Sequence, residues 1–109
     1  MRFITSSAEF KDIYSNHRKI DSVFFSLLFQ RNSKIEESSV GIVISKKIGN
    51  AVTRNKVKRW VKHYIREHKN IIKPCYKYII KAKIESGSTD WNEILNDLNI
   101  LFTDPQLCR

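Results

Sequence analysis

The residues of this sequence that most plainly indicate a chemistry are its cations. Seven Lys or Arg side chains and no acid lie between Ser45 and Lys62, where the chain reads SKKIGNAVTRNKVKRWVK. From Lys46 to Lys83 there are 13 basic residues and one acid, Glu67, so this stretch carries +12. The whole chain carries +9, which leaves the remainder at −3. A local excess of this size repels itself unless a polyanion lies against it, so the sequence predicts a nucleic-acid partner.

Side chains that could catalyse a reaction on their own are sparse. The three histidines are His17, His63 and His68, and the last two are separated by about 140° around a helix, too far to hold one metal ion. The sequence has no HExxH, GxSxG, P-loop or GxGxxG motif, and no pair of carboxylates suited to two metal ions. Cys75 and Cys108 lack metal-ligand spacing, so we expect two free thiols. We therefore expect no catalytic residue and no metal ligand in this chain.

Length and composition favour one small globular domain. The 109 residues suffice for a modest core but not for two, so we expect a single domain over residues 1–109. Hydrophobic residues make up 41% of the chain, and no apolar run approaches the roughly 20 residues of a membrane span. The first residues lack the pattern of a signal peptide. The sequence predicts a cytoplasmic protein without membrane contact.

The first half of the chain predicts one helix and two strands. Ser6 followed by Glu9 fits a capping box, and apolar residues then recur at helical spacing, so we expect a helix over residues 7–16. Two β-branched or aromatic runs follow, SVFFSLLFQ at residues 22–30 and VGIVIS from residue 40. A polar stretch separates them, and two adjacent antiparallel strands are the simplest interpretation.

The second half predicts a helix, a strand and a helix. After a glycine-containing turn, Thr53 is expected to cap a helix that ends near His68. A proline ends this segment, and the run YKYIIKAK alternates as a half-buried strand does. Asp90 is expected to cap the last helix, whose apolar stripe comprises Trp91, Ile94, Leu95, Leu98, Leu101 and Phe102. These elements predict an α+β fold, an α/β sandwich of three helices and a sheet of about four strands.

The basic helix is expected to pack by one side and to present cations on the other. Its apolar face comprises Val57, Trp60, Val61, Tyr64 and Ile65. The adjoining face carries Arg54, Lys58, Arg59, Lys62 and Arg66. A run of charge is often only a solvated face, but this one lacks acidic partners four residues away. Phosphates at the start of this helix would meet backbone N–H groups as well as Arg54 and Lys56.

Aromatic residues of the first helix and first strand offer a second candidate surface. Phe10 and Tyr14 share one stripe of the helix. In the strand, alternation separates Phe25, Leu27 and Phe29 from Phe24, Ser26 and Leu28. One of these two faces must be core, and such aromatics belong to a core more often than to a base-stacking site. The other face could floor a groove in which an unpaired nucleotide stacks.

The string VGIVISKKIGNAVTRNKVKRWVKHYIRE resembles the signature of the bacterial ribonuclease P protein family, and the order of elements agrees over essentially the whole chain. The matching positions are Ser45-Lys46-Lys47, Gly49-Asn50-Ala51-Val52, Arg54-Asn55-Lys56 and Lys58-Arg59. The resemblance implies a left-handed strand-helix-strand crossover, whereas general rules favour the right-handed one. It also implies that catalysis resides in an RNA subunit, which cleaves precursor tRNA with bound magnesium to release the 5′ leader. The protein would help that RNA fold, strengthen metal binding and hold the leader.

The resemblance also assigns roles to residues. The surface for the catalytic RNA would comprise Lys46, Lys47, Asn50, Arg54, Asn55, Lys56, Lys58, Arg59, Lys62 and Arg66. The cleft for the leader would comprise Phe10, Tyr14, Phe24, Ser26 and Leu28. Two positions depart from the family pattern. Lys56 stands where an arginine is usual and cannot make a bidentate fork to phosphate, and Leu28 stands where an aromatic residue is frequent.

Other functions remain as alternatives at the level of sequence. A general RNA-binding or ribosome-associated module of similar fold would bind many structured RNAs without affecting 5′ maturation. A DNA-binding regulator fits poorly, because strands flank the basic helix on both sides and no helix-turn-helix pair is present. The expected partners are thus the ribonuclease P RNA and precursor tRNA, with no stable protein partner and no cofactor beyond the magnesium of the RNA–protein complex.

Overall fold

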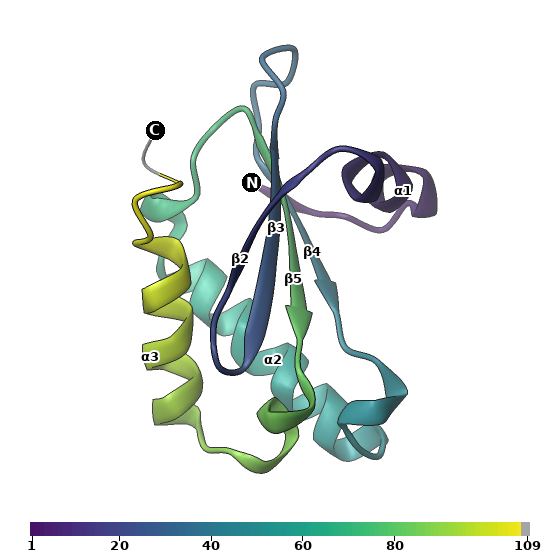
Figure 1. The fold of residues 1–109 in the computed structure, drawn as a ribbon, viewed down its shortest axis with the longest axis vertical. Coiled ribbons are helices and arrows are strands. Elements are labelled where there is room, and N and C mark those ends of the chain that lie inside the picture. Colours follow the sequence, from purple (N-terminus) through teal and green to yellow (C-terminus); the bar gives the residue numbers. More distant parts are fainter. Residues whose placement is uncertain (108–109) are drawn as a thin grey trace.

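The computed structural model describes residues 1–107, which form a five-stranded sheet with α-helices on both faces (Figure 1). The strands lie in the order β1-β4-β5-β3-β2. Three short 3-10 helices, η1 to η3, lie in the connections. The elements in chain order are β1 (Arg2–Phe3), α1 (Ser7–Ser15), β2 (Arg18–Asp21), β3 (Phe25–Arg31), β4 (Ser39–Val43), η1 (Lys46–Ile48), α2 (Ala51–Glu67), η2 (Lys69–Ile71), β5 (Tyr76–Ala82), η3 (Ile84–Ser88) and α3 (Trp91–Phe102).

The order of strands corrects one expectation from the sequence. β3 and β4 are not neighbours, because β5 lies between them, antiparallel to β3 and parallel to β4. The central position suits β5, since Tyr78, Ile79 and Ile80 are consecutive residues on alternating faces and all three are buried. The α+β class and the three α-helices are confirmed, and the sheet has five strands where about four were expected.

The connection from β4 to β5 carries the basic helix. The two strands are parallel neighbours, so the chain must cross from one end of the sheet to the other, and α2 makes that crossing. Figure 1 shows this β4-α2-β5 crossover as left-handed, as the family resemblance implies. The helix is therefore held between two adjacent strands of the sheet.

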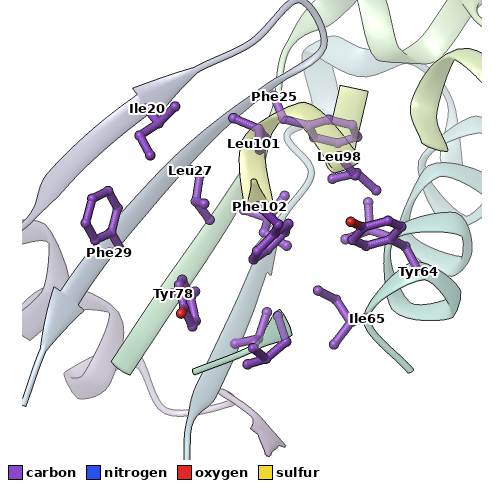
Figure 2. Packing of buried hydrophobic residues seen from close by; sticks show 14 of the residues in the cluster. Ile20, Phe25, Leu27, Phe29, Tyr64, Ile65, Tyr78, Leu98, Leu101 and Phe102 are labelled. Atoms are coloured by element: carbon purple, nitrogen blue, oxygen red, sulfur yellow. The ribbon is translucent and has the colours of Figure 1, made fainter. Parts of the chain in front are cut away.

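The sheet separates two apolar clusters of very different size. The larger one lies between the sheet and helices α2 and α3, and Figure 2 shows Tyr64 of α2 and Leu98 of α3 facing strand residues such as Leu27. The smaller one lies under α1 and consists of Ile4, Ile13, Leu28 and Ile79, with Phe10 and Val43 packed against it. Since α1 has only nine residues and lies near one end of the sheet (Figure 1), it covers part of that sheet face and leaves the rest uncovered.

Two helix starts differ from the sequence expectation and one agrees with it. The Ser6 side chain makes no cap hydrogen bond, and the Glu9 carboxylate, which a capping box would turn back to Ser6, accepts two hydrogen bonds from the Arg2 guanidinium at 3.0 and 2.8 Å. The cap of α2 is Asn50, whose Oδ1 accepts from the backbone N–H of Thr53 at 2.9 Å. Asp90 caps α3 as predicted, accepting from the N–H of Glu93 at 2.9 Å.

A buried carboxylate fixes the turn between β2 and β3. Asp97 of α3 is 4% exposed and accepts hydrogen bonds from the Ser22 hydroxyl at 2.5 Å and from the backbone N–H groups of Val23 and Phe24 at 3.2 and 3.0 Å. A buried carboxylate is tolerated only when its oxygens are satisfied in this way. The Cys75 thiol is free, as expected, and Cys108 lies outside the described residues.

Candidate nucleic-acid interface

The basic helix α2 packs as the sequence predicts. Val57, Val61, Tyr64 and Ile65 are buried in the larger cluster, and Trp60 is half-buried at its edge. The predicted RNA-contact residues that are exposed are Lys46, Lys47, Asn50, Asn55, Lys58, Arg59 and Arg66. Arg54, Lys56 and Lys62 are half-buried. We call this set of ten the cation face.

The cations of this face are not neutralised by the protein. Within residues 1–107 the ion pairs involve Arg2, Lys19, Lys77, Lys83 and the N-terminal amine, and none includes a cation of α2. The helix surface is shallowly concave where Val52, Asn55, Lys58, Arg59 and Lys62 surround a space of about 490 Å³. A concave surface with unpaired cations is suited to a phosphate backbone.

Two aromatic rings hold some of these cations in place. The Lys62 Nζ and the Arg66 guanidinium carbon lie 5.2 and 5.7 Å from the centre of the Phe3 ring on β1. The Lys56 Nζ lies 5.1 Å from the Trp60 ring centre. Such contacts orient cations without cancelling their charge. In addition, the Arg54 Nε is buried without a hydrogen-bond partner, so the guanidinium keeps an unused donor.

A separate hollow of about 240 Å³ lies on the opposite face of the sheet, beside the C-terminal end of α1. Its lining residues are Tyr14, His17, Lys19, Ser26, Leu28 and Lys81. Tyr14 is 40% exposed, and partial burial raises the pKa of its phenol. We call this space the α1 hollow.

Polar groups of the α1 hollow are already oriented by neighbours. The Ser26 hydroxyl donates to the Asp21 carboxylate at 2.5 Å, and this hydrogen bond, aided by Lys19 and Lys83, lowers the pKa of Asp21. The His17 Nδ1 lies 3.0 and 3.1 Å from the carbonyl oxygens of Ile13 and Tyr14, which are acceptors only. Because a carbonyl oxygen only accepts, the His17 Nδ1 is the donor in these two contacts.

The five residues predicted for the leader cleft do not all lie together. Tyr14, Ser26 and Leu28 line the α1 hollow, so the Leu28 side chain lies on the α1 side of the sheet. Phe10 is not among the lining residues, because its ring packs on Gly41 of β4. Phe24 precedes β3 and packs against the larger cluster, so the expectation that it shares a face with Ser26 and Leu28 is wrong. Its backbone is held by Asp97, which overrides simple alternation.

Three lining residues were missed at the sequence level, namely His17, Lys19 and Lys81. Register explains two of them, since Lys81 pairs with Ser26 across β5 and β3, and Lys19 pairs with Leu28 across β2 and β3. The polar segment that forms β2 carries no strand signal, and β5 was not expected beside β3. With the correct strand order, alternation along YKYIIKAK would have placed Lys81 on this face.

Comparisons with known proteins agree with this geometry. The family model described as Ribonuclease P matches residues 2–106. The ribonuclease P protein component of Fusobacterium nucleatum is 34% identical over 98% of this chain and 99% of its own length. That of Bacillus velezensis is 33% identical over 97% and 90%. The chain belongs to the ribonuclease P protein family.

Solved structures of ribonuclease P proteins have the same fold. The Staphylococcus aureus protein superposes with a TM-score of 0.89 at 28% identity, covering 98% of this chain and 97% of that one. The Thermotoga maritima protein gives 0.78 at 26% identity, covering 86% and 88%. As a ribonuclease P protein, the chain is the protein subunit of an endoribonuclease that acts in tRNA 5′ maturation together with an RNA subunit.

Among residues 1–107, no three His, Cys, Asp or Glu side chains gather as metal ligands. No helix in the same range is long and apolar enough to cross a bilayer.

Proposed function

We propose that the two surfaces of this ribonuclease P protein have separate tasks. The cation face docks on the catalytic RNA, and the α1 hollow holds the 5′ leader of precursor tRNA. The observation that carries this division is spatial, since the cations of α2 and the Tyr14 hollow lie on opposite faces of one sheet. One RNA can occupy the first face while an unpaired strand occupies the second.

The two surfaces differ in the contacts they offer. The cation face presents phosphate-binding groups, with Asn55, Lys58 and Arg59 exposed along about one turn of helix. The α1 hollow presents the Tyr14 ring with Lys81 against it and with Lys19 also in the lining, which suits a stacked base next to phosphates. Lys56 supplies charge in place of a guanidinium fork, and Leu28 supplies an apolar floor in place of a ring.

Magnesium acts in the RNA–protein complex and is held by the RNA, with the protein's cations lowering repulsion between phosphates. The protein works in the cytoplasm, and its partners are the catalytic RNA and precursor tRNA without a stable protein partner.

Reconstitution tests this proposal. A bacterial ribonuclease P RNA is mixed with a precursor tRNA at low magnesium, with and without the protein, and the rate of 5′ leader release is measured. We expect the protein to raise the rate at low magnesium and to have less effect at high magnesium. A protein that binds the RNA but leaves cleavage unchanged at every magnesium concentration would instead fit a general RNA-binding module.

A further inference from the structure

A cluster of aromatic rings lies along the seam between α2 and α3, beside the cation face, with which it shares Lys56. The ring centres of Trp60 and Trp91 are 6.1 Å apart, with their planes at 44°. The His63 ring meets Trp91 edge-on at 5.6 Å. The Lys56 Nζ lies over Trp60. We call these four residues the tryptophan patch.

The patch is not enclosed by the core. Trp60 and Trp91 are half-buried and pack on the edge of the larger cluster, while His63 is exposed. Tryptophan side chains that belong to a core are covered by other residues, whereas part of Trp60 and part of Trp91 remain open to solvent. The open ring surface lies beside cations, as in proteins that stack nucleobases on aromatic side chains.

The patch is continuous with the cation face. Lys56, Trp60 and His63 recur at i, i+4 and i+7, so they form one strip along α2. Arg59 is three residues from Lys56 and four from His63, and it is exposed at the border of this strip. A strand whose phosphates contact Arg59 is therefore within reach of the indole rings.

Two carboxylates near Trp91 at the start of α3, those of Asp90 and Glu93, have hydrogen-bond donors within the protein. Asp90 accepts from the Glu93 N–H as the helix cap, and the Glu93 carboxylate accepts from the Thr89 hydroxyl. These acids flank Trp91 and keep phosphates away from the start of α3. Phosphates of a bound strand must therefore lie toward α2, and its bases toward the seam.

We propose that the tryptophan patch stacks an unpaired base of the catalytic RNA, adding a base contact to the phosphate contacts of the cation face. This rests on the proposed function, because the RNA that supplies the base is the one docked on α2. The site lies on the opposite face of the sheet from the α1 hollow. It is thus distinct from the place proposed for the leader.

The two tryptophans are the only ones in the chain, so its indole fluorescence reports on the patch alone. The test titrates a bacterial ribonuclease P RNA into the protein and records both emission and affinity. We expect quenching on binding, because a stacked base contacts an indole. Trp91→Leu should weaken RNA affinity about fivefold to a hundredfold through loss of one stack, and Trp91→Phe should retain most of the affinity.

A matched control lies on the same helix. Ile100 of α3 is 63% exposed and, nine residues from Trp91, lies on the other side of the helix, so Ile100→Ala should leave affinity and emission unchanged. Urea unfolding of each variant shows whether Trp91→Leu remains folded, and Trp60→Leu serves as a second variant. Wild-type binding with unaltered emission, or folded leucine variants with wild-type affinity, would overturn the patch while leaving the proposed function intact. Absence of any RNA binding would overturn both.

Discussion

The ammonium nitrogen of Lys81 lies 5.4 Å from the centre of the Tyr14 ring, and this contact links the two walls of the α1 hollow. Tyr14 comes from α1 and Lys81 from the central strand β5. Neither residue is near the other in sequence, so the fold alone creates the pairing of an aromatic face with a cation. A nucleotide in the hollow can stack on the ring and place its phosphate at the ammonium group.

Replacing the ring should therefore weaken the binding of leaders. We expect Tyr14→Ala to lower the affinity of the reconstituted holoenzyme for precursor tRNA by about 1–3 kcal/mol, the usual worth of one stacked base. Affinity is measured with substrates that carry a leader and with mature tRNA that lacks one. Tyr14→Phe keeps the ring and should bind nearly as the wild type does. An equal loss with both RNAs would mean that Tyr14 does not contact the leader.

Removing charge from the cation face should change how RNA binding depends on salt. Lys58 and Arg59 are exposed and lack ion-pair partners among residues 1–107, so each can neutralise a phosphate. We expect the double variant Lys58→Ala, Arg59→Ala to bind the catalytic RNA more weakly. The log–log slope of affinity against salt should fall by roughly 1.4–1.8, about 0.7–0.9 for each lost contact.

The control for this experiment removes the same charge elsewhere. Lys34 and Lys69 are exposed and lie outside α2, in the β3–β4 loop and in η2. The double variant Lys34→Ala, Lys69→Ala should retain the wild-type slope, because these residues are not part of the cation face. If both double variants flatten the slope equally, RNA responds to net charge and not to this surface.

The basic helix was the most predictable part of the fold and of the site. Its 3.6-residue period separates Val57 and Val61 from Lys58 and Arg59 without reference to any other element. The N-cap of α2 is Asn50 and not the expected Thr53, because the Asn50 side chain accepts a hydrogen bond from the Thr53 N–H. Local pattern thus sufficed for the cation face, where each residue's position depends only on its own helix.

The α1 hollow was less predictable because it depends on strand order. Ser26, Lys19 and Lys81 meet only because β3 lies between β2 and β5, and two of these strands carry ambiguous or polar patterns. Phe24 leaves the expected face because the buried Asp97 binds its N–H. Contacts between residues more than 70 positions apart cannot be read from alternation along a single strand.

A close contact between Gly41 and Phe10 positions α1 on the sheet. A Cβ added at Gly41 would lie 2.5 Å from Cε1 and 2.8 Å from Cζ of the Phe10 ring. We expect Gly41→Ala to lower the free energy of unfolding by about 1–3 kcal/mol, because the ring must move within a packed cluster. Urea unfolding measures this loss. In a Phe10→Ala background the added methyl has room, so the two changes should not be additive.

Two buried phenols predict a loss of stability at alkaline pH. Burial raises the pKa of Tyr64 and of Tyr78 to about 12, above the usual 10. In the unfolded chain these phenols ionise near pH 10, so between pH 10 and about 12 the unfolded state releases protons that the folded state retains. The free energy of unfolding should therefore be unaffected by these groups below pH 10 and should fall as pH rises, by at most about 3 kcal/mol for each phenol.

Urea unfolding at increasing pH, with phenolate absorbance followed in parallel, measures this dependence. Tyr64→Phe removes one titrating group and also the 2.8 Å hydrogen bond to the Asn99 Oδ1. This variant should be less stable than the wild type at neutral pH, because the Asn99 oxygen loses its donor. It should nevertheless lose less stability on going to alkaline pH, because only Tyr78 then contributes. If all four tyrosines of the folded protein ionise together near pH 10, the two rings are accessible to water and the predicted dependence is absent.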